Sequence, residues 1–242
     1  MKMAARARDS RRPQNNNQGQ YNTLVERKSM GIPVLIIGKS GSGKSASLRN
    51  FQPEEVDIIN VEGKPLPFRN SHTTINTDNY KEVAAAVKGS EKPSIVIDDA
   101  GYLITNSFMR GHSSTGAGNA IFSFYNEIAD NFWKLITFIK GKGVAPDKVV
   151  YIMMHEDQND FGQIKPKTLG KLLDDKVCIE GMFTIVLRSV MHDGGYYFRT
   201  RTDGLDVCKT PIGLFEAAEI DNDLKAVDVA IREYYEISKE DK

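Results

Sequence analysis

The octet GKSGSGKS, residues 38–45, carries the clearest chemistry in the sequence. It follows the apolar run IPVLII and satisfies the pattern G-x-x-x-x-G-K-[ST] in full. Its three glycines let the backbone turn tightly and point successive N–H groups inward, where they can hold phosphate oxygens. We expect Lys44 to reach the β- and γ-phosphates and the hydroxyl of Ser45 to coordinate Mg²⁺. The octet therefore predicts a triphosphate site, with ATP and Mg²⁺ as cofactors.

The residues after the octet, GKSASLRNF (43–51), predict a helix whose N-terminus would add partial positive charge to this site. The alternative interpretation is a glycine-rich turn that binds nothing. The residues expected to contact the nucleotide are Gly38, Lys39, Ser40, Gly41, Ser42, Gly43, Lys44, Ser45 and Ala46.

Two adjacent acids, Asp98 and Asp99, end the apolar run in SIVIDDA. In P-loop NTPases, a carboxylate at the end of a neighbouring strand holds the magnesium shell. We assign that role to Asp98, so the predicted metal ligands are Ser45 and Asp98. Asp99 could orient or deprotonate the attacking water, or serve only as a helix cap or loop acid. The acid pair favours hydrolysis over a simple nucleotide clamp.

His155 and Lys209 complete the set of candidate catalytic residues. His155 ends the apolar run in DKVVYIMMHE and could sense the γ-phosphate, or be an ordinary strand-end histidine. Lys209 lies in VCKTPIGLF, where Pro211 and Gly213 would stiffen the chain. It could act as a finger that reaches the γ-phosphate of a neighbouring subunit, or be a surface lysine.

The elements that must position these residues alternate along the chain, which predicts an α/β fold with a mostly parallel sheet flanked by helices. A late antiparallel hairpin is expected at 181–202, with Asp-Gly-Gly at its turn. One domain, 29–242, should hold the whole core. The expected strands lie within 33–38, 55–63, 93–100 and 147–156, and the other expected helices within 79–89, 119–140 and 221–237.

Composition limits the class of protein. The chain has 242 residues, no net charge and two cysteines, which give neither a disulfide framework nor a metal pattern. No apolar run reaches the roughly 18 residues of a membrane helix, so we expect a cytoplasmic protein without a membrane contact. Residues 1–28 are rich in Arg, Asn and Gln, with seven basic and two acidic side chains. They predict a disordered basic tail that could contact phosphate backbones or simply remain solvated.

Two further segments could contact nucleic acid. The loop 156–171 is polar and carries Lys165, Lys167 and Lys171. Its alternative interpretation is a solvated surface loop. The stretch GGYYFRTRT interleaves aromatics with arginines, which could stack single-stranded bases or pack at a sheet edge. The aromatic and arginine side chains of this stretch are Tyr196, Tyr197, Phe198, Arg199 and Arg201.

Over about residues 30–237 the sequence resembles the phage-encoded, core-only RecA-like P-loop ATPases, some of which are described as single-strand annealing or recombination proteins. The octet and the acid strand are generic, and the stretches GKPLPF, KTLGKLLDDK and KTPIGLF are more specific. The resemblance implies ATP and Mg²⁺ binding, head-to-tail homo-oligomers in a ring or filament, and action on single-stranded DNA in the host cytoplasm. It also implies a single-strand-binding protein as a partner. KTPIG is similar to the KNRFG-type segment of RadA-like relatives, which supports the finger role of Lys209, although Thr-Pro-Ile replaces Asn-Arg-Phe.

Three other functions remain open at this point. An AAA-type helicase loader or protein-remodelling ATPase would also form rings, but would act on a protein and carry a helical lid after the core. A small-molecule kinase would need an Arg-rich lid. A binding module would hold the nucleotide without hydrolysing it, which the acid pair disfavours.

Overall fold

A computed structural model describes residues 30–116, 118–141, 143–169 and 177–237. The predicted tail 1–28 and Lys171 of the 156–171 loop lie outside these ranges. Within them the strands are β1 (Ile32–Gly38), β2 (Val56–Asn60), β3 (Thr74–Asn76), β4 (Ser94–Asp98), β5 (Val149–Gln158), β6 (Ile164–Pro166), β7 (Ile185–His192), β8 (Gly195–Arg199) and β9 (Glu219–Asp221). The helices are α2 (Tyr80–Gly89), α3 (Gly101–Gly111), α4 (Asn119–Lys140) and α6 (Leu224–Tyr234), with 3₁₀ turns η1 (Ser45–Asn50) and η2 (Glu180–Met182).

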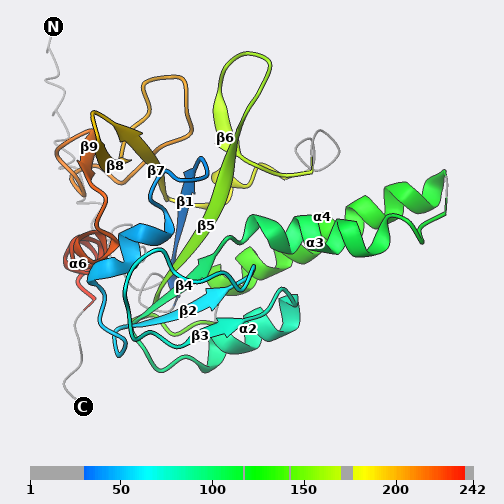
Figure 1. Cartoon of the computed structure of the whole chain (residues 1–242), viewed down its shortest axis with the longest axis horizontal. Coiled ribbons are helices and arrows are strands. Elements are labelled where there is room, and N and C mark those ends of the chain that lie inside the picture. The colour runs from blue at the N-terminus through cyan, green and yellow to red at the C-terminus, as the bar shows by residue number, and fades with distance from the viewer. Residues whose placement is uncertain (1–29, 117, 142, 170–176, 238–242) are drawn as a thin grey trace, which may run out of the picture.

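The nine described strands form one sheet in the order β3-β2-β4-β5-β1-β7-β8-β9, with β6 paired to β5 (Figure 1). Along this order, every neighbouring pair from β3 to β7 is parallel. The pairs β5–β6, β7–β8 and β8–β9 are antiparallel. Asp193 and Gly194, at the turn between β7 and β8, have φ of 51° and 76°. Two positive φ values suit the tight hairpin turns that match strand twist. The predicted α/β fold with a mostly parallel sheet and a late hairpin is confirmed.

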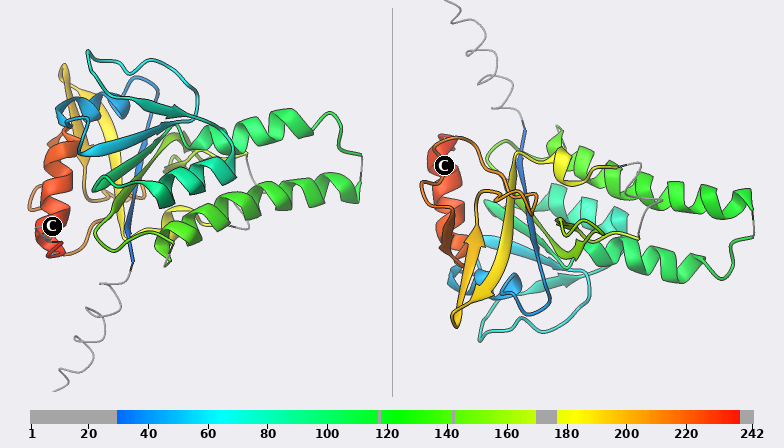
Figure 2. Two further views of the ribbon diagram at one scale, coloured as in Figure 1. Left: turned by 90° about the horizontal axis from the view of Figure 1, so that it is seen from below. Right: turned by 90° about the horizontal axis from the view of Figure 1, so that it is seen from above.

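Both faces of the sheet are covered, as expected for strands that are apolar throughout. Alternate residues of β1 point to opposite faces: Leu35 and Ile37 belong to one buried cluster, and Val34 and Ile36 to the other. The first cluster includes residues of α2, α3 and α4, and the second includes residues of η1 and α6. Figure 2 shows these helices on either side of the sheet.

Helices α3 and α4 lie side by side and project well beyond the sheet (Figures 1 and 2). The bounds of α4 agree with the predicted helix at 119–140, but its buried residues begin only at Ile128. The first part of α4 therefore belongs to a projecting arm. Gly111 permits the close approach of α3 to α4, because a methyl group at Gly111 would lie 2.4 Å from Cζ of Phe124. Helix α3 was not predicted from the sequence.

The helix expected over 43–51 is wrong in kind and length, because the structure has only the six-residue 3₁₀ turn η1. The hydroxyl of Ser47 bonds the carbonyl of Lys44 at 2.5 Å, which competes with regular helix geometry. Pro53 then disfavours helical backbone at Gln52. The expected helix dipole at the phosphate site is therefore small. The three-residue strands β3, β6 and β9 were also missed, because they are too short for a hydrophobic period.

The closing helix begins later than the predicted 221–237. Its first residue is Leu224, and the carboxylate of Asp223 accepts hydrogen bonds from the backbone N–H groups of Lys225 and Ala226. In the part of the chain that the structure describes, no helix is both long and apolar enough to cross a membrane.

Candidate functional site

The sheet order brings the predicted site residues to one edge. Strand β5 lies between β1 and β4, and the register pairs Gly38 of β1 with His155 of β5. On the other side, Asp98 ends β4 opposite Asn60 of β2. Because parallel strands end at a common edge, the octet, His155 and the acid pair meet there. The sequence alone did not establish that β5 separates the other two strands.

The octet forms a loop whose backbone requires glycine. Gly41 and Gly43 have φ of 77° and 99°, a region that other residues rarely adopt. The ammonium of Lys44 donates to the carbonyls of Gly38 at 2.8 Å and Lys39 at 2.9 Å. Burial lowers the pKa of Lys44, and the charges of Asp99 and Asp98 oppose that shift. A buried ammonium group held against a glycine-rich loop fits a triphosphate site.

Ser45 and Asp98 meet as a magnesium site requires. The Ser45 hydroxyl donates to Oδ1 of Asp98 at 3.0 Å. Asp98 is buried, and burial raises its pKa, as does the charge of Asp99, while Ser45 and Lys44 act in the opposite sense. Among the described residues no group of three or more His, Cys, Asp or Glu could hold a metal. Mg²⁺ commonly binds through one or two protein oxygens plus phosphates and water, and this pair fits that pattern.

Asp99 is held by Lys64 and His155 in a strained backbone. Its φ is 57°, which is uncommon for a residue other than glycine. Lys64 Nζ lies 2.5 Å from Oδ2 of Asp99, and His155 Nε2 lies 3.4 Å from Oδ1. Burial alone would raise the pKa of Asp99, but the hydrogen bonds from His155 and Lys64 hold it at about 2. Asp99 is thus an ionised carboxylate at neutral pH.

Lys64 is a site residue that sequence reasoning missed. It lies in the stretch GKPLPF, which was noted only for its resemblance. Its ammonium also lies 5.7 Å from the ring centre of Tyr102, and the Tyr102 ring meets the His155 ring edge-on at 5.9 Å. A lysine in a loop between β2 and β3 carries no pattern that predicts a partner at Asp99, directly after β4.

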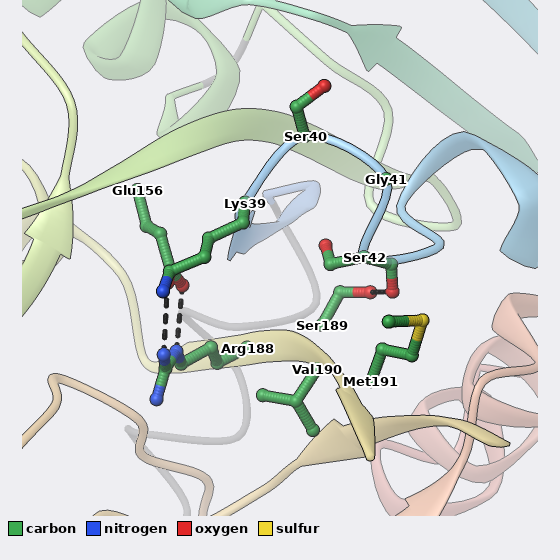
Figure 3. Close-up of a pocket in the computed structure, with 9 residues that line it drawn as sticks. All are labelled: Lys39, Ser40, Gly41, Ser42, Glu156, Arg188, Ser189, Val190 and Met191. Carbon is green, nitrogen blue, oxygen red and sulfur yellow. Dashed lines mark hydrogen bonds and ion pairs between the residues drawn. The ribbon is translucent and has the colours of Figure 1, made fainter. Parts of the chain in front are cut away.

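A cavity of about 230 Å³ adjoins the loop on the side of β7, and its nine lining residues are drawn in Figure 3. A buried ion pair forms one wall: Arg188 donates to both carboxylate oxygens of Glu156, at 2.7 and 2.9 Å. Arg188 also lies 3.6 Å from the buried carboxylate of Asp206. Lys39 of the octet faces this pair (Figure 3). The pair was not predicted, because its members are 32 positions apart.

Lys209 does not meet the phosphate loop within the chain. Its backbone N–H and C=O exchange hydrogen bonds with Val186, and Val186 pairs with Leu35, three residues before Gly38. The side chain of Lys209 is exposed. Its expected action on a neighbouring subunit therefore stays a prediction.

The loop 156–171 begins as a hairpin rather than an irregular segment. Residues 156–158 of β5 pair with 164–166 of β6, and the hairpin projects from the sheet (Figure 1). Phe161, near its tip, is 93% exposed. The backbone carbonyl of His155 accepts a hydrogen bond from the N–H of Lys167 at 2.7 Å, so the hairpin is joined to the site histidine.

The stretch GGYYFRTRT mainly packs the sheet edge. Phe198 is fully buried, Arg199 pairs with Asp203 and Asp206, and Arg201 donates to the carbonyl of Glu216. Tyr197 stacks on His192 with ring centres 4.5 Å apart. Of the three aromatic side chains in this stretch, these contacts leave Tyr196 as the exposed one.

Comparisons with known proteins agree with this geometry. A family model described as an AAA domain matches residues 30–210, which include the octet, the acid pair, His155 and Lys209. No curated protein matches the sequence. Family membership supports nucleotide binding and ATP hydrolysis in general, and the α/β sheet is consistent with a P-loop NTPase. The chain belongs to the AAA domain family.

Proposed function

We propose that the protein is a phage-encoded, RecA-like, magnesium-dependent ATPase that acts on single-stranded DNA in recombination, annealing or replication. The observation that carries the ATPase part is the meeting of Lys44, Ser45 and Asp98 at the carboxyl ends of β1 and β4. The DNA part rests on the hairpin that leaves the same edge and on the resemblance described above. We also propose that the protein acts in the cytoplasm of a host cell.

Each site residue has a task that follows from its position. Lys44 and the loop N–H groups bind the phosphates, while Ser45 and Asp98 hold Mg²⁺. When bound, Mg²⁺ neutralises charge on the β- and γ-phosphates. Asp99 accepts a hydrogen bond from the attacking water and orients it, since a carboxylate with pKa about 2 is a weak base. His155 fixes the direction of Asp99.

The link from nucleotide to DNA would run along β5. His155 contacts Asp99, and the residues after it form the projecting hairpin with Phe161 exposed. Exposed aromatic rings stack on single-stranded bases at roughly 1–3 kcal/mol per base. A change in the contacts of His155 when the γ-phosphate leaves would alter the direction of the hairpin.

The partners follow from the same reading. The protein would assemble head-to-tail as a ring or filament, with Lys209 of one copy completing the site of the next. A single-strand-binding protein would deliver the DNA.

Two assays test the proposal. Magnesium-dependent release of phosphate from ATP should fall to background in Lys44→Ala, and unchanged turnover would end the ATPase proposal. Binding of a fluorescent single-stranded oligonucleotide should rise with an ATP analogue and fall steeply with salt. Phe161→Ala should weaken it about tenfold, whereas Phe122→Ala, an exposed aromatic of the α3–α4 arm, should not.

A helicase loader or protein-remodelling ATPase is the second candidate. Family membership and the projecting arm favour it, because the arm exposes the large apolar side chains of Met109 and Phe122, and Trp133 is exposed further along α4. Such a surface suits a protein partner. An ATPase that binds no single-stranded DNA at low salt, with or without nucleotide, would select this function over the first.

A further inference from the structure

Two side chains that the proposed catalytic roles do not use lie against the phosphate loop. Tyr196 is the second residue of β8 and is 46% exposed, and Asn222 follows β9 and is 2% exposed. A methyl group placed on Gly43 would lie 2.9 Å from Cδ1 of Tyr196 and 3.1 Å from Oδ1 of Asn222. Both side chains therefore touch the loop at the residue before Lys44.

Asn222 is fixed in place but has an unused acceptor. Its Nδ2 donates to the hydroxyl of Ser189 at 3.1 Å, and its backbone N–H donates to the carbonyl of Tyr196 at 3.2 Å. Its backbone carbonyl accepts from Arg49 at 2.6 Å. Oδ1 is buried and has no hydrogen-bond partner among the described residues. A buried acceptor without a partner is costly, so it marks a place where a donor from a ligand would be stabilised.

The path of a nucleotide through the loop leads toward these residues. The γ-phosphate end is set by Asp98 and Asp99 on the β4 side of β1, so the nucleoside leaves on the opposite side of the loop, toward β7 and β8. The junction of β9 and α6 lies beside η1, because Asn50 bonds Asp223 at 2.8 Å and Arg49 bonds Asn222. The nucleoside thus emerges beside Asn222 and Tyr196.

The surface at that point suits a flat, aromatic ligand. Tyr196 pairs across the β7–β8 hairpin with Met191, which is 60% exposed and lines the cavity beside the loop (Figure 3). A tyrosine ring gives a base a face to stack on, and a thioether packs well against aromatic edges.

We propose that Tyr196 and Asn222 form the nucleoside subsite of the phosphate loop. The ring of Tyr196 stacks on a nucleobase, and Oδ1 of Asn222 accepts a hydrogen bond from an N–H or O–H of the nucleoside. The inference rests on the proposed nucleotide-binding function, and adds the part of the site that distinguishes a nucleotide from a bare polyphosphate.

The test compares two ligands by calorimetry: a non-hydrolysable ATP analogue and inorganic tripolyphosphate, each with Mg²⁺. Tyr196→Ala should weaken the analogue roughly tenfold or more and leave tripolyphosphate unchanged. Tyr196→Phe should keep wild-type affinity for both. Asn222→Ala should weaken the analogue several-fold. Tyr197→Ala, its neighbour in β8 that stacks on His192, is the matched control and should change neither affinity.

Each result decides the matter. Equal loss of both ligands in Tyr196→Ala, or no loss of either, overturns the subsite. Tyr196→Leu repeats the comparison with an apolar side chain beside Gly43 if the alanine variant does not fold. If wild type binds neither ligand, the proposed function fails with it. If wild type binds both equally and Tyr196→Ala is silent, the phosphate site stands and the subsite alone is wrong.

Discussion

Replacing Arg188 by methionine should lower the free energy of unfolding strongly, although Arg188 is not one of the proposed catalytic residues. Arg188 holds Glu156 by two hydrogen bonds and also lies near Asp206. The side chains of Glu156 and Asp206 are 2% and 0% exposed, and that of Arg188 is 16% exposed. Methionine fills much of the volume of the arginine side chain, but it leaves the buried carboxylate of Glu156 without its partner. Breaking a buried pair in this way costs about 3–5 kcal/mol.

Thermal unfolding followed by circular dichroism measures this cost. For a chain of this size, 1 kcal/mol shifts Tm by roughly 2–4 °C, so the expected loss is roughly 6–20 °C. The control is Lys134→Met, whose pair with Asp130 spans 3.5 Å with both side chains more than 60% exposed. An exposed pair of this kind contributes less than about 0.5 kcal/mol.

Two outcomes bear on the reasoning. If Arg188→Met melts within a degree or so of Lys134→Met, burial does not make this pair strong and the argument fails. The double variant Arg188→Met with Glu156→Gln should recover part of the lost stability, because the second change removes the unpaired charge.

The remaining predictions concern single groups. Gly43→Ala should abolish binding of both an ATP analogue and tripolyphosphate, since φ is 99° and the new methyl group would meet Tyr196; calorimetry checks this. The pKa of Asp99 is about 2, below its usual 3.8, so Asp99 stabilises the fold above pH 3.8 and this contribution is lost as pH falls toward 2. The stability difference between wild type and Asp99→Asn should therefore shrink over that window in acid-unfolding curves. Hydrogen bonds that His192 donates to the carboxylates of Asp193 and Glu219 raise its pKa above 6.5, so its contribution is complete below pH 6.5 and lost as pH rises through the raised pKa. An NMR titration should show that pKa fall in Glu219→Gln.

The elements with a clear period or motif were predicted well from the sequence. The bounds of α4 were predicted to the residue, because 22 residues repeat an apolar side chain every three or four positions. The octet and Asp98 were correctly placed at strand ends because apolar runs stop there, but β5 continues three residues past His155 to Gln158, because residues 156–158 pair with β6. Contacts between distant segments had no such signal. Lys64 reaches Asp99 from a loop, and Arg188 meets Glu156 across β1, which lies between their strands.

Local competition explains the failure over 43–51. A helix was predicted from the residues that follow the octet, but the Ser47 hydroxyl and Pro53 shorten the segment to a single 3₁₀ stretch. The projecting arm was also not predicted. The apolar period shows which face of α4 is apolar, but it does not show how much of the helix packs against the core.

The sheet order has a consequence for how the protein acquires its site. Strand β1, which ends in the phosphate loop, pairs with β5 and β7, and both follow α4 in the chain. Such distant pairings are slow to form, because a long loop must close before any contact is gained. A chain still emerging from the ribosome would carry the complete octet without the strands that shape it. Nucleotide affinity should therefore appear abruptly, once β7 has been made, and ligand would then stabilise the finished fold by mass action.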